Sequence, residues 1–205
     1  MYRLIKRALD ALVAILGLCV LAPVWVALGL AIELDSPGPV FFRQKRVGLN
    51  KTYFSIFKFR TMRVDTPQDT PTHLLADPDS QITGVGRWLR KTSLDEVPQL
   101  LNILRGDMSL IGPRPALWNQ DDLIAERDKY GANDVRPGLT GWAQVNGRDE
   151  LPIDVKARLD GEYVSRMSPW FDAKCLFMTL ASVLRADGVV EGAARPDDDT
   201  TGNSA

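Results

Sequence analysis

The chain has 205 residues, of which 25% are charged and 45% are hydrophobic, and its formal net charge is −1. This composition is typical of a globular protein with one domain plus an appendage, and the near-neutral charge gives no support for a nucleic-acid partner. Two cysteines exclude a disulfide framework, and the single histidine, His73, argues against a histidine-bound zinc site or a Ser-His-Asp triad. Any metal would be a hard, oxygen-bound ion, of which Mg²⁺ is the first choice.

The first predicted element is an uncharged run from Ala11 to Ile32. At ~1.5 Å per residue, a straight helix of this length would cross the core of a bilayer, and the run is long for a secretory signal. Pro23 lies in its middle and removes one helix hydrogen bond. Both flanks are basic, and basic flanks prefer the cytoplasm. The flanks slightly favour a helix that breaks at Pro23 and returns to the same side, but a kinked helix that spans the membrane stays open as an alternative.

Two strands are predicted next, from Val40 to Gln44 and from Tyr53 to Phe59, around a turn at 48–50. A polar loop with several prolines follows over 64–80, and a short basic helix is expected from Gly84 to Lys91.

Two adjacent acids, Asp95 and Glu96, lie at the predicted start of the following helix. Ser93 to Glu96 matches the capping box S/T-x-x-E, so the acids could act only on the helix start. The same location also binds phosphate, and an ionised carboxylate there can act as a nucleophile or a metal ligand. Basic residues on both sides favour phosphate chemistry, and they are Arg87, Arg90, Lys91, Arg105 and Arg114.

The remaining elements are a polar helix over 121–130, a loop-strand-loop segment over 136–148, and two helices over 153–166 and 168–186. The last of these is rich in aromatic and aliphatic residues, and both core packing and lying on a membrane surface would explain that composition. Residues 191–205 are predicted to be a disordered acidic tail.

Three segments together point to a family. They are FKFRTM (57–62), TSLDEVPQLLNILRGDMSLIGPRP (92–115) and VRPGLTGWAQVNGR (135–148). This set closely resembles the bacterial sugar transferases, specifically the monotopic phosphoglycosyl transferases, and the resemblance runs from Tyr2 to about Val190.

The resemblance implies an α+β fold in three parts. Residues 1–34 would form a re-entrant membrane helix broken at Pro23. Residues 35–190 would form a compact, mostly helical cytosolic catalytic domain with a small β-sheet and amphipathic helices on the membrane surface. Residues 191–205 would be the tail.

The resemblance also implies a reaction. The family transfers a sugar-1-phosphate from a UDP-sugar to polyprenyl phosphate, releasing UMP, with Mg²⁺ as cofactor. This is the first membrane step of bacterial glycoconjugate synthesis, and it takes place at the cytoplasmic face of the inner membrane. The expected partners are therefore a UDP-sugar, polyprenyl phosphate and membrane lipids, without nucleic acid. The identity of the sugar and the formation of a homodimer stay open.

By the same match, Asp95 would be the nucleophile and a ligand of Mg²⁺, and Glu96 would assist by orientation, proton handling or both. The basic residues that match substrate-binding positions are Lys58, Arg90, Arg114, Arg136 and Arg148. Asp160 matches an acidic position near the site.

Two other classes of protein compete with this prediction. A membrane-anchored, non-catalytic scaffold of a glycan assembly complex would keep the anchor and core, but it would not need the acid pair and its arginines. A membrane-anchored nucleotide hydrolase would be expected to carry a GxxxxGK loop, which this sequence lacks.

Overall fold

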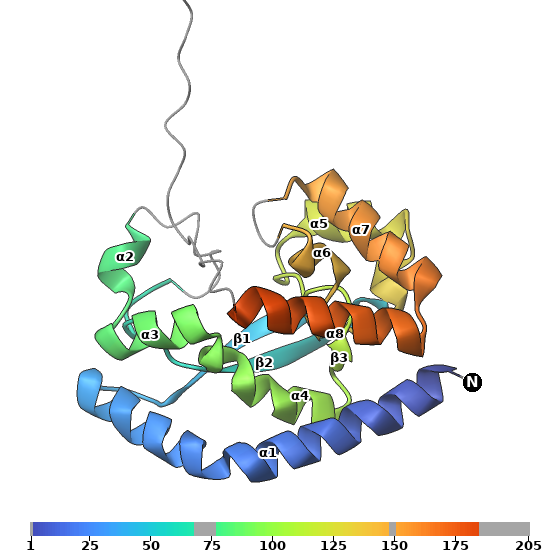
Figure 1. Cartoon of the computed structure of the whole chain (residues 1–205). Helices are drawn as coiled ribbons and strands as arrows, with labels where there is room; N and C mark the ends of the chain where they lie inside the picture. Colours follow the sequence, from blue (N-terminus) through green and yellow to red (C-terminus); the bar gives the residue numbers. More distant parts are fainter. Residues whose placement is uncertain (1, 68–76, 148–150, 185–205) are drawn as a thin grey trace, which may run out of the picture.

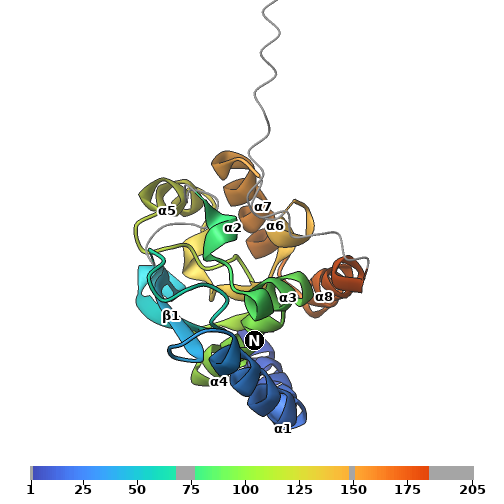
Figure 2. The same ribbon diagram turned by 90° about the vertical axis from the view of Figure 1, so that its left-hand side faces the viewer.

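The computed structural model describes residues 2–67, 77–147 and 151–184. Helix α1 (Tyr2–Asp35) runs along one side of the molecule, and α3 (Gly84–Thr92) and α4 (Leu100–Arg105) lie next to it (Figure 1). Figure 2 shows the same arrangement from the end, with α1 and α4 side by side. The predicted tail over 191–205 lies outside the described residues.

A second group of helices lies on the side of the molecule away from α1 (Figure 1). It contains α5 (Asp121–Asp128), η4 (Ala132–Asp134), α6 (Trp142–Val145) and α7 (Ile153–Arg166). Helix α8 (Pro169–Leu184) crosses the front between this group and α3–α4 (Figure 1). The remaining short helix, α2 (Pro78–Gln81), precedes α3.

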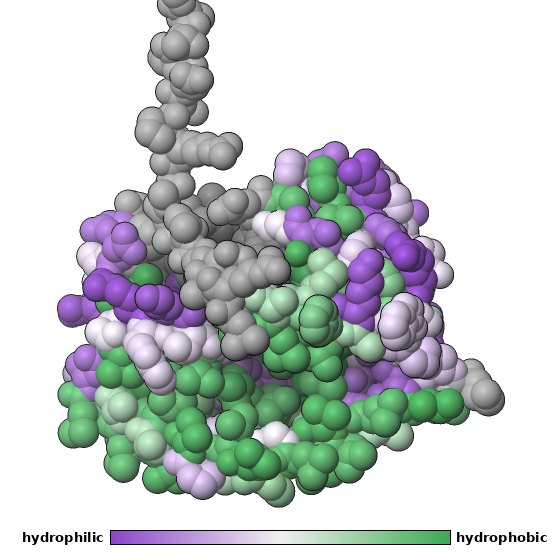
Figure 3. Space-filling model, in the orientation of Figure 1, coloured by the Kyte–Doolittle hydropathy of each residue, from purple (hydrophilic) through white to green (hydrophobic). Residues whose placement is uncertain are grey.

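Helix α1 is continuous through Pro23, and Figure 1 shows it as one curved helix. The prediction of a break at this residue is therefore corrected to a bend, because the missing N–H of proline removes one hydrogen bond without ending the helix. The inner face of the bend is buried at Ala14, Leu28 and Ile32. The outer face is apolar and exposed, as Figure 3 shows along the length of α1.

The N-terminal end of α1 is tied to α8 and α4 by charged groups. Lys6 Nζ and the Tyr2 hydroxyl both donate to Asp172 Oδ2 of α8, each at 2.6 Å. Arg7 donates to the carbonyl oxygens of Ile103 and Leu104 at 2.6 and 2.8 Å. These carbonyls belong to the last turn of α4. The Gly106 N–H also donates to the Ile103 carbonyl at 3.1 Å, and the arginine adds a charged donor to both oxygens.

The C-terminal end of α1 is tied to the residues that follow β2 and to α3. Arg60, 5% exposed, donates to the carbonyl oxygens of Ile32 and Ser36 at 3.5 and 2.6 Å. Asp35 Oδ2 accepts from the Val85 N–H at 2.9 Å. Both ends of the helix are thus attached to the same body.

The predicted hairpin is confirmed, with β1 (Phe41–Val47) slightly longer than expected and β2 (Tyr53–Phe59) as expected. The strands are antiparallel, and Phe41 pairs with Phe59. The turn η1 (Leu49–Lys51) places Asn50 at φ 51°, which asparagine tolerates better than most residues. A second small sheet pairs β3 (Ser109–Ile111) in parallel with β4 (Gly138–Thr140).

Most predicted helices are also confirmed. Helix α7 has the expected bounds, and the Ser168 hydroxyl caps α8 by accepting from the Phe171 N–H at 3.3 Å. Two of the expected loops contain a short helix. Helix α2 begins within the loop expected over 64–80, of which residues 68–76 lie outside the described residues. After β4, the expected loop contains α6, whose Trp142 packs on Phe171 at a ring-centroid distance of 5.0 Å. This packing involves residues far apart in the sequence, which a local pattern does not reveal.

The apolar core joins α1 to the rest of the molecule. Ala14 of α1 packs with Ile56, Leu100, Ile103 and Met108. A second cluster puts Phe171 and Cys175 of α8 inside, whereas Trp170 and Phe177 on the same helix are 81% and 73% exposed. Helix α8 therefore packs into the core and presents an apolar outer face as well.

Candidate active site

The acid pair lies in η3 (Leu94–Gln99), a 3-10 turn between α3 and α4. Ser93 takes a left-handed conformation at φ 57°, and its N–H closes α3 on the Arg90 carbonyl at 3.1 Å. Its side chain makes no capping hydrogen bond, so the predicted capping box is wrong. Pro98 is accommodated inside the 3-10 turn, and the regular helix begins only at Leu100.

Glu96 is held by two cations from other segments, and this explains why it does not cap the turn. Lys58 Nζ at the end of β2 lies 2.7 Å from Glu96 Oε1. Arg114, in the loop after β3, donates to the same oxygen through Nη1 and Nη2, each at 3.3 Å. Burial alone would raise the pKa of Glu96, but Lys58 and Arg114 outweigh it and lower the pKa to about 2. Glu96 is therefore an ionised acceptor that positions both cations.

Asp95 lies beside the same lysine. Its residue is 8% exposed, and its Oδ2 is 3.7 Å from Lys58 Nζ. A single amine is thus within reach of both carboxylates. The structure brings together Lys58, Asp95, Glu96 and Arg114, which the sequence scatters over three segments.

Arg90 lies in the last turn of α3, shortly before η3 in the chain, and its Nε donates to Thr61 Oγ1 at 3.0 Å. This contact depends on close packing of α3 against the chain after β2. A Cβ atom at Gly86 would lie 2.0 Å from the Thr61 carbonyl oxygen, so only glycine fits there.

Two predicted site residues contact other parts of the molecule. Arg136 Nε donates to the Gly106 carbonyl at 2.8 Å, beyond the far end of α4. Asp160, 1% exposed, pairs with Arg127 at 2.6 Å and joins α7 to α5. Burial raises the pKa of Asp160, while Arg127 opposes that shift. Among the described contacts, neither residue touches the acid pair, and Arg148 lies outside the described residues.

Asn102 is a positioning residue that the sequence prediction missed. It is fully buried; its Nδ2 donates to the Ser55 carbonyl at 2.8 Å, and its Oδ1 accepts from the Phe57 N–H at 2.9 Å. It therefore fixes α4, which follows the acid pair, to β2, which carries Lys58. The sequence did hold one indication of this role, because Asn102 is the single polar residue in the apolar run Leu100–Leu104. A buried amide is expected to hydrogen-bond, often to backbone groups.

Comparison with known proteins identifies the family. The family model described as "Bacterial sugar transferase" matches residues 1–186. The chain belongs to this family. The resemblance seen in the three sequence segments is thereby confirmed over nearly the whole described chain.

Three relatives illustrate the similarity. An undecaprenyl-phosphate glucose phosphotransferase of Komagataeibacter xylinus is 44% identical over 187 residues, covering 85% of this chain and 35% of the relative. A UDP-glucose:undecaprenyl-phosphate glucose-1-phosphate transferase of Escherichia coli (strain K12) is 40% identical over 191 residues, covering 87% and 40%. The uncharacterized sugar transferase EpsL of Bacillus subtilis (strain 168) is 40% identical over 186 residues, covering 91% and 90%. The chain thus spans well under half of the first two relatives and most of the third.

The residues of the site could supply only part of the ligand set of an Mg²⁺ ion, and substrate phosphates would have to supply the rest. Among the residues that the structure describes, no group of three or more His, Cys, Asp and Glu side chains could hold a metal. Mg²⁺ commonly binds through one or two carboxylates together with substrate phosphates. Asp95 is the carboxylate that would contribute, because Glu96 is already bound by Lys58 and Arg114.

Replacing Glu96 with glutamine should lower the free energy of unfolding at pH 7 by on the order of 2 kcal/mol. The reason is that the folded-state pKa of about 2 lies below the ordinary value of 4.5. A lowered carboxyl pKa contributes stability above the unfolded-state pKa, and that stability is lost as the pH falls from about 4.5 towards 2. Denaturant unfolding of both proteins at pH 7 and at about pH 3 measures this. The gap between the two proteins should narrow at the lower pH, and equal stability at pH 7 would contradict the assignment.

Proposed function

We propose that this protein transfers a sugar-1-phosphate from a UDP-sugar to polyprenyl phosphate, with Asp95 as a covalent nucleophile. The observation that supports this most is the acid pair, with Asp95 buried and Glu96 partly buried, Lys58 within 3.7 Å of the first and 2.7 Å of the second, and Arg114 on Glu96. Such a site combines an attacking oxygen with cations that stabilise charge on a transferring phosphoryl group. The names of two relatives add that family members act on undecaprenyl phosphate.

The reaction proceeds in two displacements. The Asp95 carboxylate oxygen attacks the phosphorus attached to the sugar, a new P–O bond forms, and the bond from that phosphorus to UMP breaks. An oxygen of polyprenyl phosphate then attacks the same phosphorus, and the bond to Asp95 breaks. The carboxylate is regenerated, and the product is a polyprenyl diphosphate sugar. One site thereby handles a soluble donor and a lipid acceptor in turn.

The other residues bind and orient. Glu96, ionised because its pKa is about 2, holds Lys58 and Arg114 so that their remaining N–H donors can face a phosphate. In this role Glu96 orients the cations rather than exchanging a proton. Bound Mg²⁺, held by Asp95 and the donor diphosphate, would offset the charge of the diphosphate.

The protein is proposed to enter the membrane through α1 without crossing it. The described part of the chain contains one helix that is long and apolar enough to span, Tyr2–Asp35. Its two ends are attached to the same body, at Asp172 and at Arg60. Its outer face, apolar over its length in Figure 3, would be immersed. The most exposed apolar residues on it are Leu4, Val20, Val26, Leu30 and Leu34.

The body would then lie at the cytoplasmic face of the inner membrane, because the basic groups at the N-terminal end of α1 favour that side. Helix α8, with Trp170 and Phe177 exposed, would rest on the same surface. A donor dissolved in the cytoplasm and a lipid acceptor could meet at the acid pair in this arrangement.

The reaction is tested with the full chain in detergent micelles, undecaprenyl phosphate and a panel of UDP-sugars, read as UMP release. UDP-glucose comes first because two relatives are named for glucose, and galactose and N-acetylated sugars complete the panel. One or more donors should turn over, excess EDTA should abolish turnover, and added Mg²⁺ should restore it. No UMP release from any donor would favour the alternative, a non-catalytic scaffold, and full activity in EDTA would remove the metal from the proposal.

A further inference from the structure

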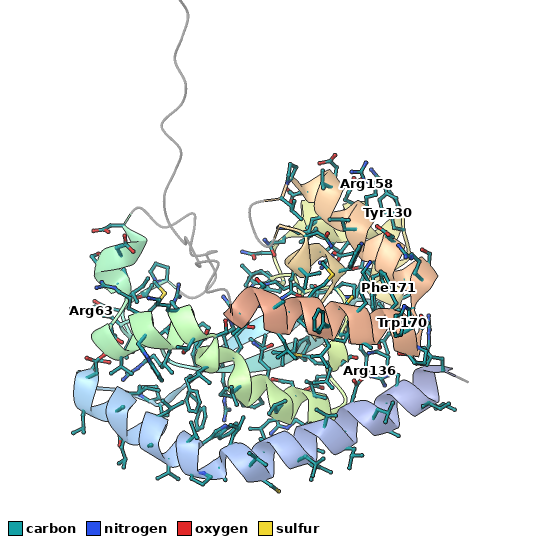
Figure 4. All side chains as sticks on the ribbon, in the orientation of Figure 1. Arg63, Tyr130, Arg136, Arg158, Trp170 and Phe171 are labelled. Atoms are coloured by element: carbon teal, nitrogen blue, oxygen red, sulfur yellow. The ribbon has the colours of Figure 1, made fainter. Side chains whose placement is uncertain are left out.

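A cavity lies at the N-terminal end of α1, apart from the acid pair. Its volume is about 90 Å³, and its lining contains none of Lys58, Asp95, Glu96 and Arg114. A buried water requires only ~10–15 Å³ on this measure, so the cavity has room for a small chemical group. Figure 4 shows Arg136, which lines it, between α8 and the N-terminal half of α1.

Three arginines line this cavity, namely Arg3, Arg7 and Arg136. Arg7 and Arg136 are held in place by donating to backbone carbonyls at the C-terminal end of α4, at 2.6 to 2.8 Å. A guanidinium has five N–H donors, so each keeps donors for a further acceptor. Arg3 is exposed, and within the described residues it makes no hydrogen bond or ion pair.

The acids of the cavity do not neutralise these arginines. Asp10 accepts from the Ser109 hydroxyl at 2.7 Å and lies 3.8 Å from Lys6, which also lines the cavity and pairs with Asp172. Asp134 is exposed and forms no ion pair with the three arginines in the described structure. The lining therefore carries more positive than negative charge, and an anion would bind there with charge-assisted hydrogen bonds.

The surroundings indicate what kind of anion. The exposed apolar residues Leu4 and Ile5 follow Arg3 on α1. Trp170, 81% exposed, lies two residues before Asp172, the partner of Lys6. Tryptophan is enriched at the level of lipid headgroups, and arginine pairs with phosphate in a bidentate manner. With α1 inserted, the cavity would thus lie at headgroup depth, next to a surface for acyl chains.

We propose that this cavity binds the phosphate of an anionic phospholipid, with Arg3, Arg7 and Arg136 as donors and the acyl chains along the outer face of α1. The site is separate from the acid pair, and it does not depend on the transfer reaction. It would hold the N-terminal end of α1 at a fixed depth in the bilayer.

The test measures binding without any UDP-sugar. The full chain in a neutral maltoside detergent is titrated with dioctanoyl phosphatidylglycerol, and the rise in melting temperature gives an apparent Kd. Arg3→Gln should raise this Kd by about fivefold or more, because a charge-assisted contact is lost. Arg3→Lys should raise it less, since the charge is kept. Arg158→Gln, on the exposed face of α7 and outside the cavity (Figure 4), is the matched control and should leave the Kd unchanged.

Two further compounds show whether binding needs both the acyl chains and the phosphate of one lipid molecule. Dioctanoylglycerol, which has the chains without the phosphate, should give no saturable shift, and inorganic phosphate at the same concentrations should not compete. Equal Kd values for wild type, Arg3→Gln and Arg136→Gln would overturn the proposal. Competition by inorganic phosphate would assign the cavity to a soluble anion instead. Binding of polyprenyl phosphate at least tenfold tighter than phosphatidylglycerol, lost in Arg3→Gln, would assign it to the acceptor.

Discussion

Asp95→Asn should abolish sugar-phosphate transfer and leave the protein folded. Asparagine keeps the shape of the side chain in this buried position but lacks the anionic oxygen that attacks phosphorus. We expect turnover to fall by more than ~10³-fold, the scale seen when a nucleophilic system is disabled. The melting temperature should change little, because the turn is built by the backbone, by Pro98 and by the contacts of Glu96. Asp122→Asn, an exposed acid in the first turn of α5, is the matched control and should retain full turnover.

The covalent step has its own readout. Wild-type protein with a UDP-sugar and no lipid should release UMP in an amount comparable to the enzyme. A phospho-sugar mass should then be found on the peptide that contains Asp95, and it should be absent from Asp95→Asn. UMP release only in the presence of polyprenyl phosphate, with no adduct at any time, would favour direct transfer between the two substrates.

Both ends of α1 should face the cytoplasm, and labelling should show this as an all-or-none result. After replacement of Cys19 and Cys175, single cysteines are introduced at two positions. Arg3 reports on the N-terminal end of α1, and Asp122 in α5 reports on the body to which the C-terminal end of α1 is tied. Neither should react with a membrane-impermeant maleimide added outside spheroplasts, and both should react in inverted membrane vesicles.

The physical reason is the cost of separating α1 from the body. Crossing the membrane would break the pairing of Lys6 and Tyr2 with Asp172 and the bonds from Arg7 to α4. Breaking a buried ion pair typically costs ~3–5 kcal/mol, because one charge is left buried without a partner. Labelling of the Arg3 position from outside, with the Asp122 position labelled only from inside, would show that α1 spans.

The local elements of this fold could be predicted from sequence because each has a local cause. Two apolar, aromatic segments on either side of the turn at 48–50 predicted the hairpin of β1 and β2, and Ser168 followed by Pro169 predicted the start of α8. The prediction of a capping box was wrong because contacts with distant residues outweigh the local pattern. Ser93 to Glu96 satisfied the pattern of a capping box, yet ionic contacts from Lys58 and Arg114 determine where Glu96 points. In a capping box the carboxylate would accept from a single backbone N–H, whereas here it pairs with two full positive charges, which is the stronger interaction.

The candidate site shows the same division. Sequence motifs indicated Lys58, Asp95, Glu96 and Arg114, and the fold places these four together. Motifs also indicated Arg136, which instead bonds to Gly106 and lines the cavity at the N-terminal end of α1. A motif records that a residue type recurs in a family, but it does not say which contact the residue makes.

By itself, the sequence determined the apolar helix, the acid pair, the basic segments around it and the family to which they belong. These follow from hydropathy, charge and motif spacing, which are properties of the chain alone. Only the tertiary structure decided that both ends of α1 are tied to one body, through Asp172 and Arg60, and that Asn102 fixes the acid-bearing segment to β2. These contacts join residues that are 24 to 166 positions apart, and nothing in a local pattern specifies which distant partner satisfies a buried charge or amide.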